Sequence, residues 1–133
     1  MIFLDSSFLI SVEVDTDQNH KKASVITDGI ASGKYGMPAI SDYIFDEVIT
    51  VTFGRTKDLE KAVLVGEKLN ESAEMIKIED LYFREAWEIF KDQKDTRLSF
   101  TDCTTLALMR GRGIKTIATF DGDFKKVKGI TVV

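Results

Sequence analysis

The chain has 133 residues of which 44% are hydrophobic, enough for one domain with a single core, and its apolar stretches are too short to span a bilayer or to form a secretory signal. We therefore expect a single cytoplasmic domain over residues 1–133 with no membrane partner. One cysteine and one histidine exclude an internal disulfide and a zinc tetrad, and a net charge of −4 argues weakly against a large polyanion as partner.

Short apolar segments alternate with helix-length segments along the chain. The opening stretch MIFLDSSFLI predicts a buried strand at Ile2–Leu4 that runs into Asp5 and a helix starting at Ser6–Ile10. Further strands are predicted at Tyr35–Ala39, Met75–Ile78, Thr116–Thr119 and Ile130–Val133. Further helices are predicted at Lys21–Ala31, Asp42–Thr52, Lys57–Asn70, Leu81–Phe90 and Thr101–Arg110. This alternation is typical of βαβ units, so we predict an α/β fold, a three-layer α/β/α sandwich with a central, mainly parallel sheet.

Carboxylates stand where two of the predicted strands end. Asp5 follows the first strand directly, and Asp121 follows the strand in IATF, with Asp123 two residues further along. Asp102, in the stretch LSFTDCTTLALM, falls in the first turn of a predicted helix. Ligands of an open parallel sheet bind beyond the carboxyl ends of the strands, so these side chains could meet in one crevice.

A further acidic position lies inside the predicted helix at Asp42–Thr52, where Asp46 and Glu47 are neighbours. Residues three and four apart share a helix face. Glu47 therefore lies beside Tyr43 and Val51 on the apolar face, whereas Asp46 lies about 100° away, on the side expected to face solvent. Glu47 is the stronger candidate, and Asp46 stays the alternative.

Carboxylates that meet in one place repel one another, and burial of even one without a partner costs several kcal/mol, so the cluster is stable only with a cation. No set of histidine or thiolate ligands is present. All ligands would be hard oxygens, which suit Mg²⁺ or Mn²⁺. These ions activate water and stabilise the charge of a phosphoryl displacement, so the acids indicate phosphodiester hydrolysis.

Each acid also has a purely structural explanation. Asp5 could cap the helix that follows it, Asp102 could interact with its helix dipole, and the Asp-Gly pair at Asp121 could only make a turn. Glu47 could form a salt bridge. None of these roles explains why all the acids are placed to converge.

Two hydroxyl side chains, Ser7 and Thr101, stand close to the acids in the sequence. They could bond to the carboxylates or orient a water, although Ser and Thr near helix starts are more often caps. A group of aromatic side chains is expected in the core or in a subunit contact and not as stacking platforms for bases. These residues are Tyr43, Phe45, Phe83, Trp87 and Phe90.

Four segments, in this order and spacing, resemble the PIN domain and, more narrowly, the VapC-type toxin ribonucleases of prokaryotic toxin–antitoxin pairs. They are MIFLDSSFLI, DEVITVTF, FTDCTTLALM and TFDGDF. No single segment is specific, since each is little more than an acid in an apolar frame. Together they span essentially the whole chain.

The resemblance implies an endoribonuclease that depends on Mg²⁺ or Mn²⁺, hydrolyses RNA and is the toxin of a type II pair. It implies catalytic roles for Asp5, Glu47, Asp102 and Asp121, of which Asp5, Asp102 and Asp121 hold metal. Asp123 is a candidate additional metal ligand, and Glu47 would position the metal or the attacking water. The resemblance also implies a homodimer and an antitoxin protein that blocks the crevice.

Basic residues gather in the last part of the chain. Residues 1–96 hold 11 basic and 19 acidic side chains, whereas residues 97–133 hold 7 basic and 3 acidic ones. An RNA-contacting rim is one explanation, and a scatter of solvated side chains is the other. The residues concerned are Arg97, Arg110, Arg112, Lys115, Lys125, Lys126 and Lys128.

Other functions stay open from the sequence alone. A PIN-type nuclease outside a toxin–antitoxin pair would process RNA with the same acids. A non-nucleolytic α/β module would use them only to hold metal, and a small-molecule phosphatase would form a phosphoaspartate at Asp5. RNA cleavage that stops on addition of EDTA separates a nuclease from the last two.

Overall fold

The first strand is a short apolar run and lies at the centre of the sheet. A strand in that position has neighbours on both sides and helices on both faces, so all of its side chains are buried. β1 (Ile2–Leu4) pairs in parallel with β2 (Pro38–Ser41) and with β4 (Thr116–Ala118). β3 (Glu74–Ile76) and β5 (Thr131–Val132) form the edges, so the strand order is β3-β2-β1-β4-β5. The predicted parallel sheet is confirmed in the computed structural model, which describes all 133 residues.

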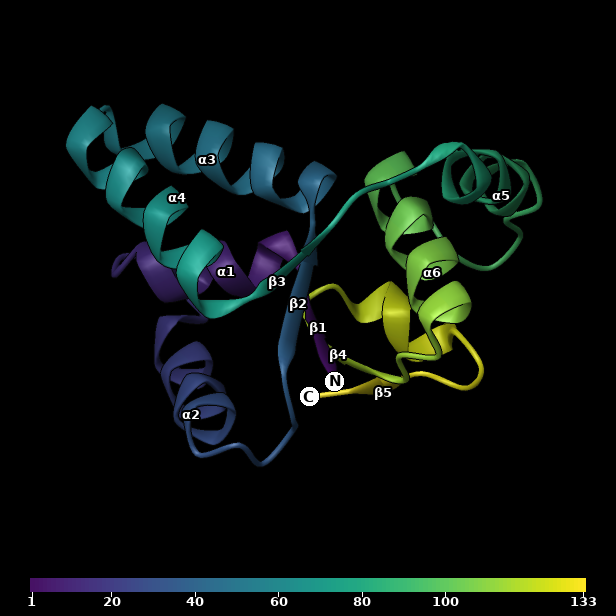
Figure 1. Ribbon diagram of the computed structural model, residues 1–133, viewed down its shortest axis with the longest axis horizontal. Coiled ribbons are helices and arrows are strands. Elements are labelled where there is room, and N and C mark those ends of the chain that lie inside the picture. Colours follow the sequence, from purple (N-terminus) through teal and green to yellow (C-terminus); the bar gives the residue numbers. More distant parts are fainter.

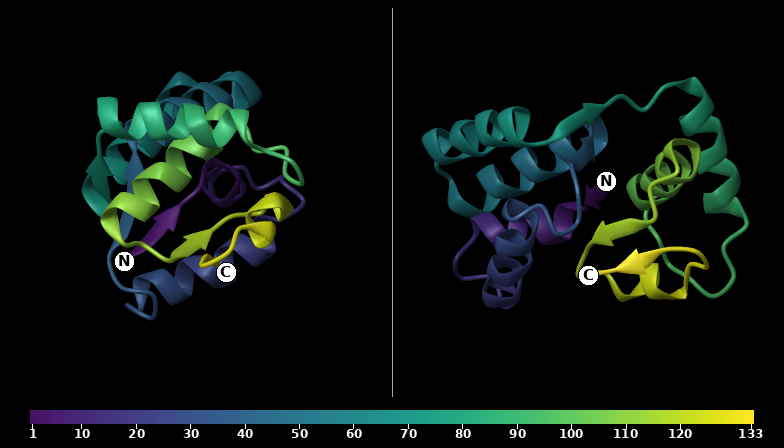
Figure 2. Two further views of the ribbon diagram at one scale, coloured as in Figure 1. Left: turned by 90° about the vertical axis from the view of Figure 1, so that its right-hand side faces the viewer. Right: turned by 60° about the horizontal axis from the view of Figure 1, so that its bottom comes forward.

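Helices cover both faces of the sheet, as predicted. Figure 1 shows one group of helices on one side of the strands and a second group on the other, and the turned views in Figure 2 show the same layers. The first group is α1 (Ser6–Glu13), α2 (His20–Ala31), α3 (Asp42–Thr56) and α4 (Leu59–Ser72). The second is α5 (Asp80–Lys91) and α6 (Phe100–Arg112), and a 3-10 turn, η1 (Gly122–Lys126), follows β4.

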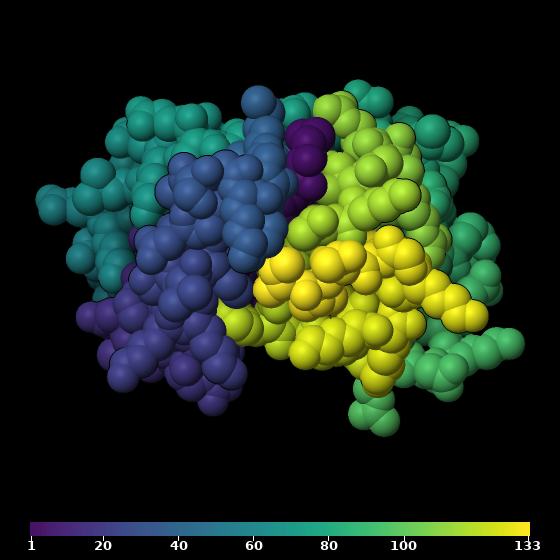
Figure 3. All heavy atoms as spheres, turned by 90° about the horizontal axis from the view of Figure 1, so that it is seen from below, coloured from purple at the N-terminus to yellow at the C-terminus, as the bar shows by residue number.

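The first and last parts of the chain share one side of the molecule. Seen from below, α2 and the loop after it lie on one side and η1 and β5 on the other, with the first residues between them at the top (Figure 3).

None of the helices combines the length and the apolar character that crossing a membrane would require.

Two strands differ by two residues or more from their predicted bounds, for local reasons, whereas β4 and β5 lie within one residue of theirs. The strand predicted at Tyr35–Ala39 begins only at Pro38, because Gly33 and Gly36 both take a φ of 78° and form a turn across that stretch. The strand predicted at Met75–Ile78 ends at Ile76, because the N–H of Ile78 donates to the Asp42 carboxylate at 2.9 Å instead of to a neighbouring strand.

The connections that leave β1 and β4 diverge to opposite sides of the sheet. From β1 the chain continues to β2 and β3 on one side of the sheet, then crosses to β4 and β5 on the other. Neighbouring strands whose connections diverge in this way form the ligand-binding switch point of an open α/β sheet. The N–H of Asp5 still donates to the carbonyl of Ala118 at 3.0 Å, so the ladder extends up to the first acid.

Phe124 anchors the η1 turn that follows Asp121, because its ring is fully buried. We expect Phe124→Ala to lower the free energy of unfolding by about 3–5 kcal/mol through lost burial and the cavity left behind. The matched control is Phe53→Ala, since Phe53 on α3 is 46% exposed and little packing is lost there. Urea denaturation measures both, and a Phe124→Ala loss no larger than that of Phe53→Ala would contradict this role.

Candidate active site

Asp5 lies buried at the end of β1, with 2% of its surface exposed. It occupies the cap position of α1, yet its side chain accepts no bond from that helix's backbone. Its Oδ2 instead accepts from the hydroxyls of Ser7 at 2.5 Å and Thr119 at 2.7 Å, and its Oδ1 is buried without a partner. Burial raises the pKa of this carboxyl above its ordinary value, although the two hydroxyls, and after them the backbone N–H groups of Ser6 and Ser7, lower it in part. The carboxylate therefore bonds mainly to the two hydroxyls and not as a helix cap, and its Oδ1 accepts no hydrogen bond.

The two hydroxyls around Asp5 are oriented by the chain that follows β4. The N–H of Phe120 donates to Ser7 Oγ and that of Asp121 donates to Thr119 Oγ1, both at 3.0 Å. Each hydroxyl thereby accepts from the backbone and gives its single proton to Asp5. Of the two roles predicted for Ser7, the bond to a carboxylate is the one observed. Thr119 was missed by sequence analysis, because its role depends on pairing across 114 residues.

Asp102 lies in the first turn of α6, where Ser99 precedes the helix. The two residues form a capping box: the N–H of Ser99 donates to Asp102 Oδ2 at 2.8 Å, and the N–H of Asp102 donates to Ser99 Oγ at 3.1 Å. The structural role expected for Asp102 is thus real, and the spacing Ser-x-x-Asp was the signal for Ser99, which sequence analysis missed. Burial, then the negative charge of Asp5 and more weakly that of Asp121, raise the pKa of Asp102 to about 6.

Asp121 stands at the exit of β4 and also shapes the turn there. Its Oδ1 accepts from the N–H of Asp123 at 2.9 Å, which caps η1. The turn expected from the Asp-Gly pair is present, and it is compatible with a functional role since the second oxygen carries no hydrogen bond. The effect of its charge on Asp102 places it within electrostatic reach of that carboxyl.

Asp123 is turned toward basic groups and away from a ligand role. Its Oδ1 receives the ammonium of Lys126 at 2.6 Å and its Oδ2 accepts from the N–H of Arg97 at 2.9 Å. The bond to Lys126 and then that to Arg97 hold the pKa of this carboxyl below its ordinary value. Both oxygens are in use, so Asp123 has no free oxygen comparable to that of Asp5.

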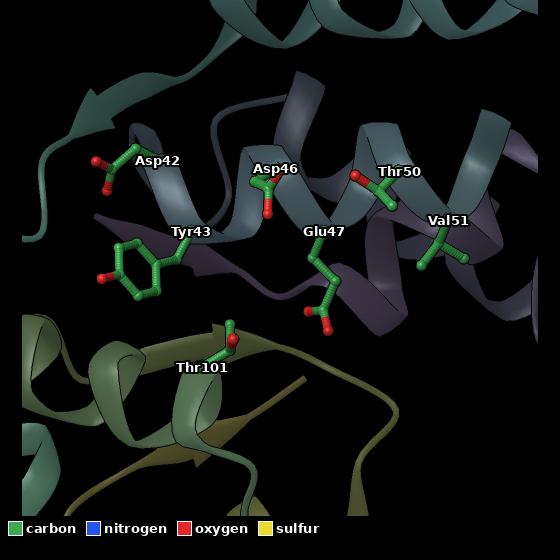
Figure 4. A pocket seen from close by; sticks show the side chains of 7 residues that line it. All are labelled: Asp42, Tyr43, Asp46, Glu47, Thr50, Val51 and Thr101. Atoms are coloured by element: carbon green, nitrogen blue, oxygen red, sulfur yellow. The ribbon is translucent and has the colours of Figure 1, made fainter. Parts of the chain in front are cut away.

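Glu47 faces a groove between α3 and α6. The groove has a volume of about 560 Å³, and Figure 4 shows Tyr43 and Glu47 pointing from α3 toward Thr101, the neighbour of Asp102 on α6. Glu47 is half-buried and forms no ion pair or hydrogen bond, whereas Asp46 is exposed. The helix periodicity predicted this difference, and the salt bridge considered for Glu47 is absent. The hydroxyl of Thr101 bonds to none of the acids.

The acids supply hard oxygen ligands, but they do not form a preformed metal-binding site. No group of three or more acidic, His or Cys side chains is placed to hold an ion as the side chains lie. A local reason is that Asp102 folds back onto Ser99 and Asp121 onto the turn. The free buried Oδ1 of Asp5 and the raised pKa of Asp102 show uncompensated negative charge, which a divalent cation would neutralise. The residues present therefore fit such an ion.

The basic residues of the last third do not form one rim. Arg112 pairs with Glu74 at 2.7 Å and Arg110 with Glu85 at 3.9 Å. Both arginines lie at the end of α6, about 12–15 Å along the helix axis from Asp102, on the side where β4 begins. Arg97 and Lys125 are exposed and flank the acids, one before α6 and the other after Asp121.

The chain matches known proteins over nearly its whole length. Residues 2–130 match the PIN domain family. The 23S rRNA-specific endonuclease VapC20 of Mycobacterium tuberculosis is 26% identical over 124 residues, which cover 93% of this chain and 92% of that protein. The crystal structure of M. tuberculosis VapC20, described as a sarcin-ricin loop cleaving toxin, aligns with a TM-score of 0.81 over 95% of this chain and 94% of that one.

Two solved complexes share the fold at lower identity. VapBC2 from Rickettsia felis, bound to a DNA fragment from its promoter, aligns with a TM-score of 0.72 and 14% identity over 100% of this chain and 98% of that one. DNA-bound VapBC from Salmonella typhimurium gives a TM-score of 0.72 and 17% identity over 99% and 96%. The sheet order, the switch point and the match over residues 2–130 agree: this chain belongs to the PIN domain family.

Proposed function

We propose that this protein is a metal-dependent endoribonuclease that hydrolyses phosphodiester bonds of RNA, and that it is the toxin of a type II toxin–antitoxin pair. The observation that carries the proposal is the buried Oδ1 of Asp5 without a partner, at the switch point between β1 and β4 and joined through Thr119 to the strand exit that carries Asp121. The name of the relative VapC20 as a 23S rRNA-specific endonuclease supports RNA as the substrate class.

Asp5, Asp102 and Asp121 are the residues that we propose to hold Mg²⁺ or Mn²⁺, since their oxygens are hard donors. When bound, such an ion supplies a Lewis acid that stabilises the charge built up during phosphodiester hydrolysis. Ser7 and Thr119 fix the orientation of Asp5, and Glu47 orients the attacking water from across the groove. Asp123 drops out of the ligand set, because both of its oxygens bond within the chain.

An antitoxin is the protein partner that we propose. The neighbours from R. felis and S. typhimurium are VapBC assemblies. An apolar groove between α3 and α4, about 400 Å³ in volume and lined by Phe45, Ile49 and Phe53, offers a seat for an apolar segment. Thr50 lines both this groove and the acidic groove that contains Glu47, so a segment seated in the first leads into the second.

A homodimer is the assembly that we propose, through the half-exposed aromatic cluster that α5 forms with Phe100 of α6. Phe83, Trp87 and Phe90 are 46%, 49% and 39% exposed and surround the ring of Phe100 on α6, with centroids 5.1–6.3 Å away. Clustered apolar exposure of this kind marks protein contacts. The expectation for these side chains was the core or a subunit contact; their exposure excludes the core for Phe83, Trp87 and Phe90, and a subunit contact is what we propose for them.

Asp102→Asn is expected to reduce RNA cleavage about a hundredfold or more, because a metal oxygen is lost. Its carbonyl oxygen still accepts from Ser99, so the helix cap survives. The folded-state pKa is raised to about 6 from 3.8, so ionisation costs stability as pH rises through that window, and at pH 7.5 without metal the melting temperature should hold or rise. Cleavage assays with and without EDTA and thermal melts check both, and full activity would refute the proposal.

Glu47→Gln is expected to lower the cleavage rate about tenfold to a hundredfold while leaving the fold intact, since its carboxylate makes no ion pair or hydrogen bond. Asp46→Asn is the matched control, because it removes the same charge one residue away, from a more exposed carboxylate on the rim of the same groove. If Asp46→Asn were the more damaging variant, the assignment of the α3 acid would be reversed.

Arg97→Glu combined with Lys125→Glu should weaken RNA affinity at least tenfold and flatten its salt dependence, because two phosphate contacts are lost beside the acids. The control is Arg110→Glu with Arg112→Glu, whose side chains already pair with acids at the opposite end of α6. Filter binding at several salt concentrations, with Ca²⁺ in place of Mg²⁺, measures the effect. A larger loss in the control pair would contradict the placement of the RNA.

Trp87→Lys should convert the protein to a monomer, since a charge in the centre of the α5 face cannot be buried without a partner. Val25→Lys on α2, at a site that is 72% exposed, is the control for adding a lysine to a surface. Light scattering after size exclusion reports the mass, and a Trp87→Lys protein that stays dimeric would exclude this face.

A further inference from the structure

We infer that Asp123 and Gln93 are positioning residues that together fasten the segment before α6 to the η1 turn, and so hold Asp102 and Asp121 in register with each other. This role rests on the proposed metal-dependent function, in which both aspartates act on one ion. The carboxylate of Asp123, the side-chain amide of Gln93 and the ammonium of Lys126, with the backbone of residues 93–98, are called the clamp below.

Asp123 ties three parts of the chain together. Its backbone N–H donates to Asp121 Oδ1 at 2.9 Å, which fixes the carboxylate two residues earlier. Its own Oδ2 accepts from the N–H of Arg97 at 2.9 Å, across 26 residues. Its Oδ1 bonds to Lys126 at 2.6 Å, and the same ammonium donates to the carbonyl of Asp95 at 3.1 Å. Two separate bonds therefore join η1 to the loop that leads into α6.

Gln93 gives that loop its shape. The Oε1 of its amide accepts from the N–H of Leu98 at 2.7 Å and from the hydroxyl of Thr96 at 2.9 Å. Its Nε2 donates to the carbonyl of Leu98 at 3.0 Å, so one side chain closes a loop of six residues. Leu98 is only 3% exposed and anchors the end of the loop in the core. The loop therefore presents the N–H of Arg97 to Asp123 in a fixed place.

The clamp reaches both aspartates through short, ordered connections. Arg97 is two residues from Ser99, which caps α6 and holds the Asp102 carboxylate through its N–H. On the other side, Asp123 holds the Asp121 carboxylate directly. The bonds between the two segments therefore restrict the distance between Asp102 and Asp121.

A positioning role and a ligand role for Asp123 predict different outcomes. Asparagine keeps an oxygen that can accept from Arg97, whereas alanine removes it. Gln93 bonds within the loop before α6 and to the carbonyl of Phe90 in α5, but to neither η1 nor an aspartate, yet it is required if the shape of that loop matters. Lys94, exposed in the same loop and without a hydrogen bond or ion pair, is the matched control for a substitution there.

The test is Mn²⁺ titration by calorimetry of the full chain and of Asp123→Ala, Asp123→Asn, Gln93→Ala and Lys94→Ala. Loss of a residue that orients metal ligands typically weakens affinity 10- to 100-fold, so we expect about tenfold weaker binding for Asp123→Ala and for Gln93→Ala. We expect Asp123→Asn and Lys94→Ala to stay close to the parent. Because the two damaging changes break one unit, their double variant should lose less than the product of the single losses. Amide hydrogen exchange at Asp102 and Cys103 should be faster in Asp123→Ala and in Gln93→Ala than in the parent chain.

Unchanged Mn²⁺ affinity in both Asp123→Ala and Gln93→Ala would overturn the inference. Equal damage from Asp123→Asn and Asp123→Ala, with none from Gln93→Ala, would overturn it in favour of a direct ligand. If Asp123→Ala does not fold, the Mn²⁺ affinity of Gln93→Ala compared with that of Lys94→Ala tests the inference alone. A parent chain that shows these metal dependences but leaves RNA intact would refute the proposed function while supporting the positioning role.

Discussion

The parallel pairing of β1 with β4 is the constraint on which the rest of the site depends. It joins segments more than a hundred residues apart, and it brings the exit of one strand, with Asp5, beside the exit of the other, with Thr119 and Asp121. The hydroxyls of Ser7 and Thr119, one beside each exit, then both donate to the same carboxylate oxygen of Asp5 and so connect the two exits. Because both hydroxyls are held by backbone N–H groups, the orientation of Asp5 follows from the sheet itself.

Bringing acids together at this edge costs stability, and the structure contains local features that limit the cost. Asp102 is stabilised by its capping box, Asp121 by the turn that it caps, and Asp123 by a lysine and a backbone N–H. Among these acids, only Asp5 keeps a buried oxygen without a partner. A buried acceptor of this kind is expensive unless a cation or a proton meets it. The folded chain is therefore expected to be more stable with a hard cation bound at these acids than without one.

Much of this could be predicted from the sequence, and what could not has physical reasons. Strand exits at Asp5 and Asp121 follow from apolar runs that end in an acid, and the preference for Glu47 over Asp46 follows from helix periodicity. Thr119 and the loop closed by Gln93 could not be predicted, because their partners are set by tertiary contacts. The bonds of Asp123 to Lys126 and to the N–H of Arg97 could not be predicted either, because the second of them joins segments 26 residues apart. Nor does sequence periodicity show that α5 leaves Trp87 half exposed, since that depends on which elements pack beside it.

The central claim is that carboxylates from two strand exits and one helix start share a divalent ion. Anomalous diffraction from crystals soaked in Mn²⁺ tests it most directly, because the scattering locates the ion independently of any activity. The account predicts a single dominant peak within coordination distance of Asp5, bridged to Asp102 or Asp121, with oxygen ligands at about 2.0–2.2 Å as for small hard cations. A peak held by other residues, or none at saturating Mn²⁺, would contradict it.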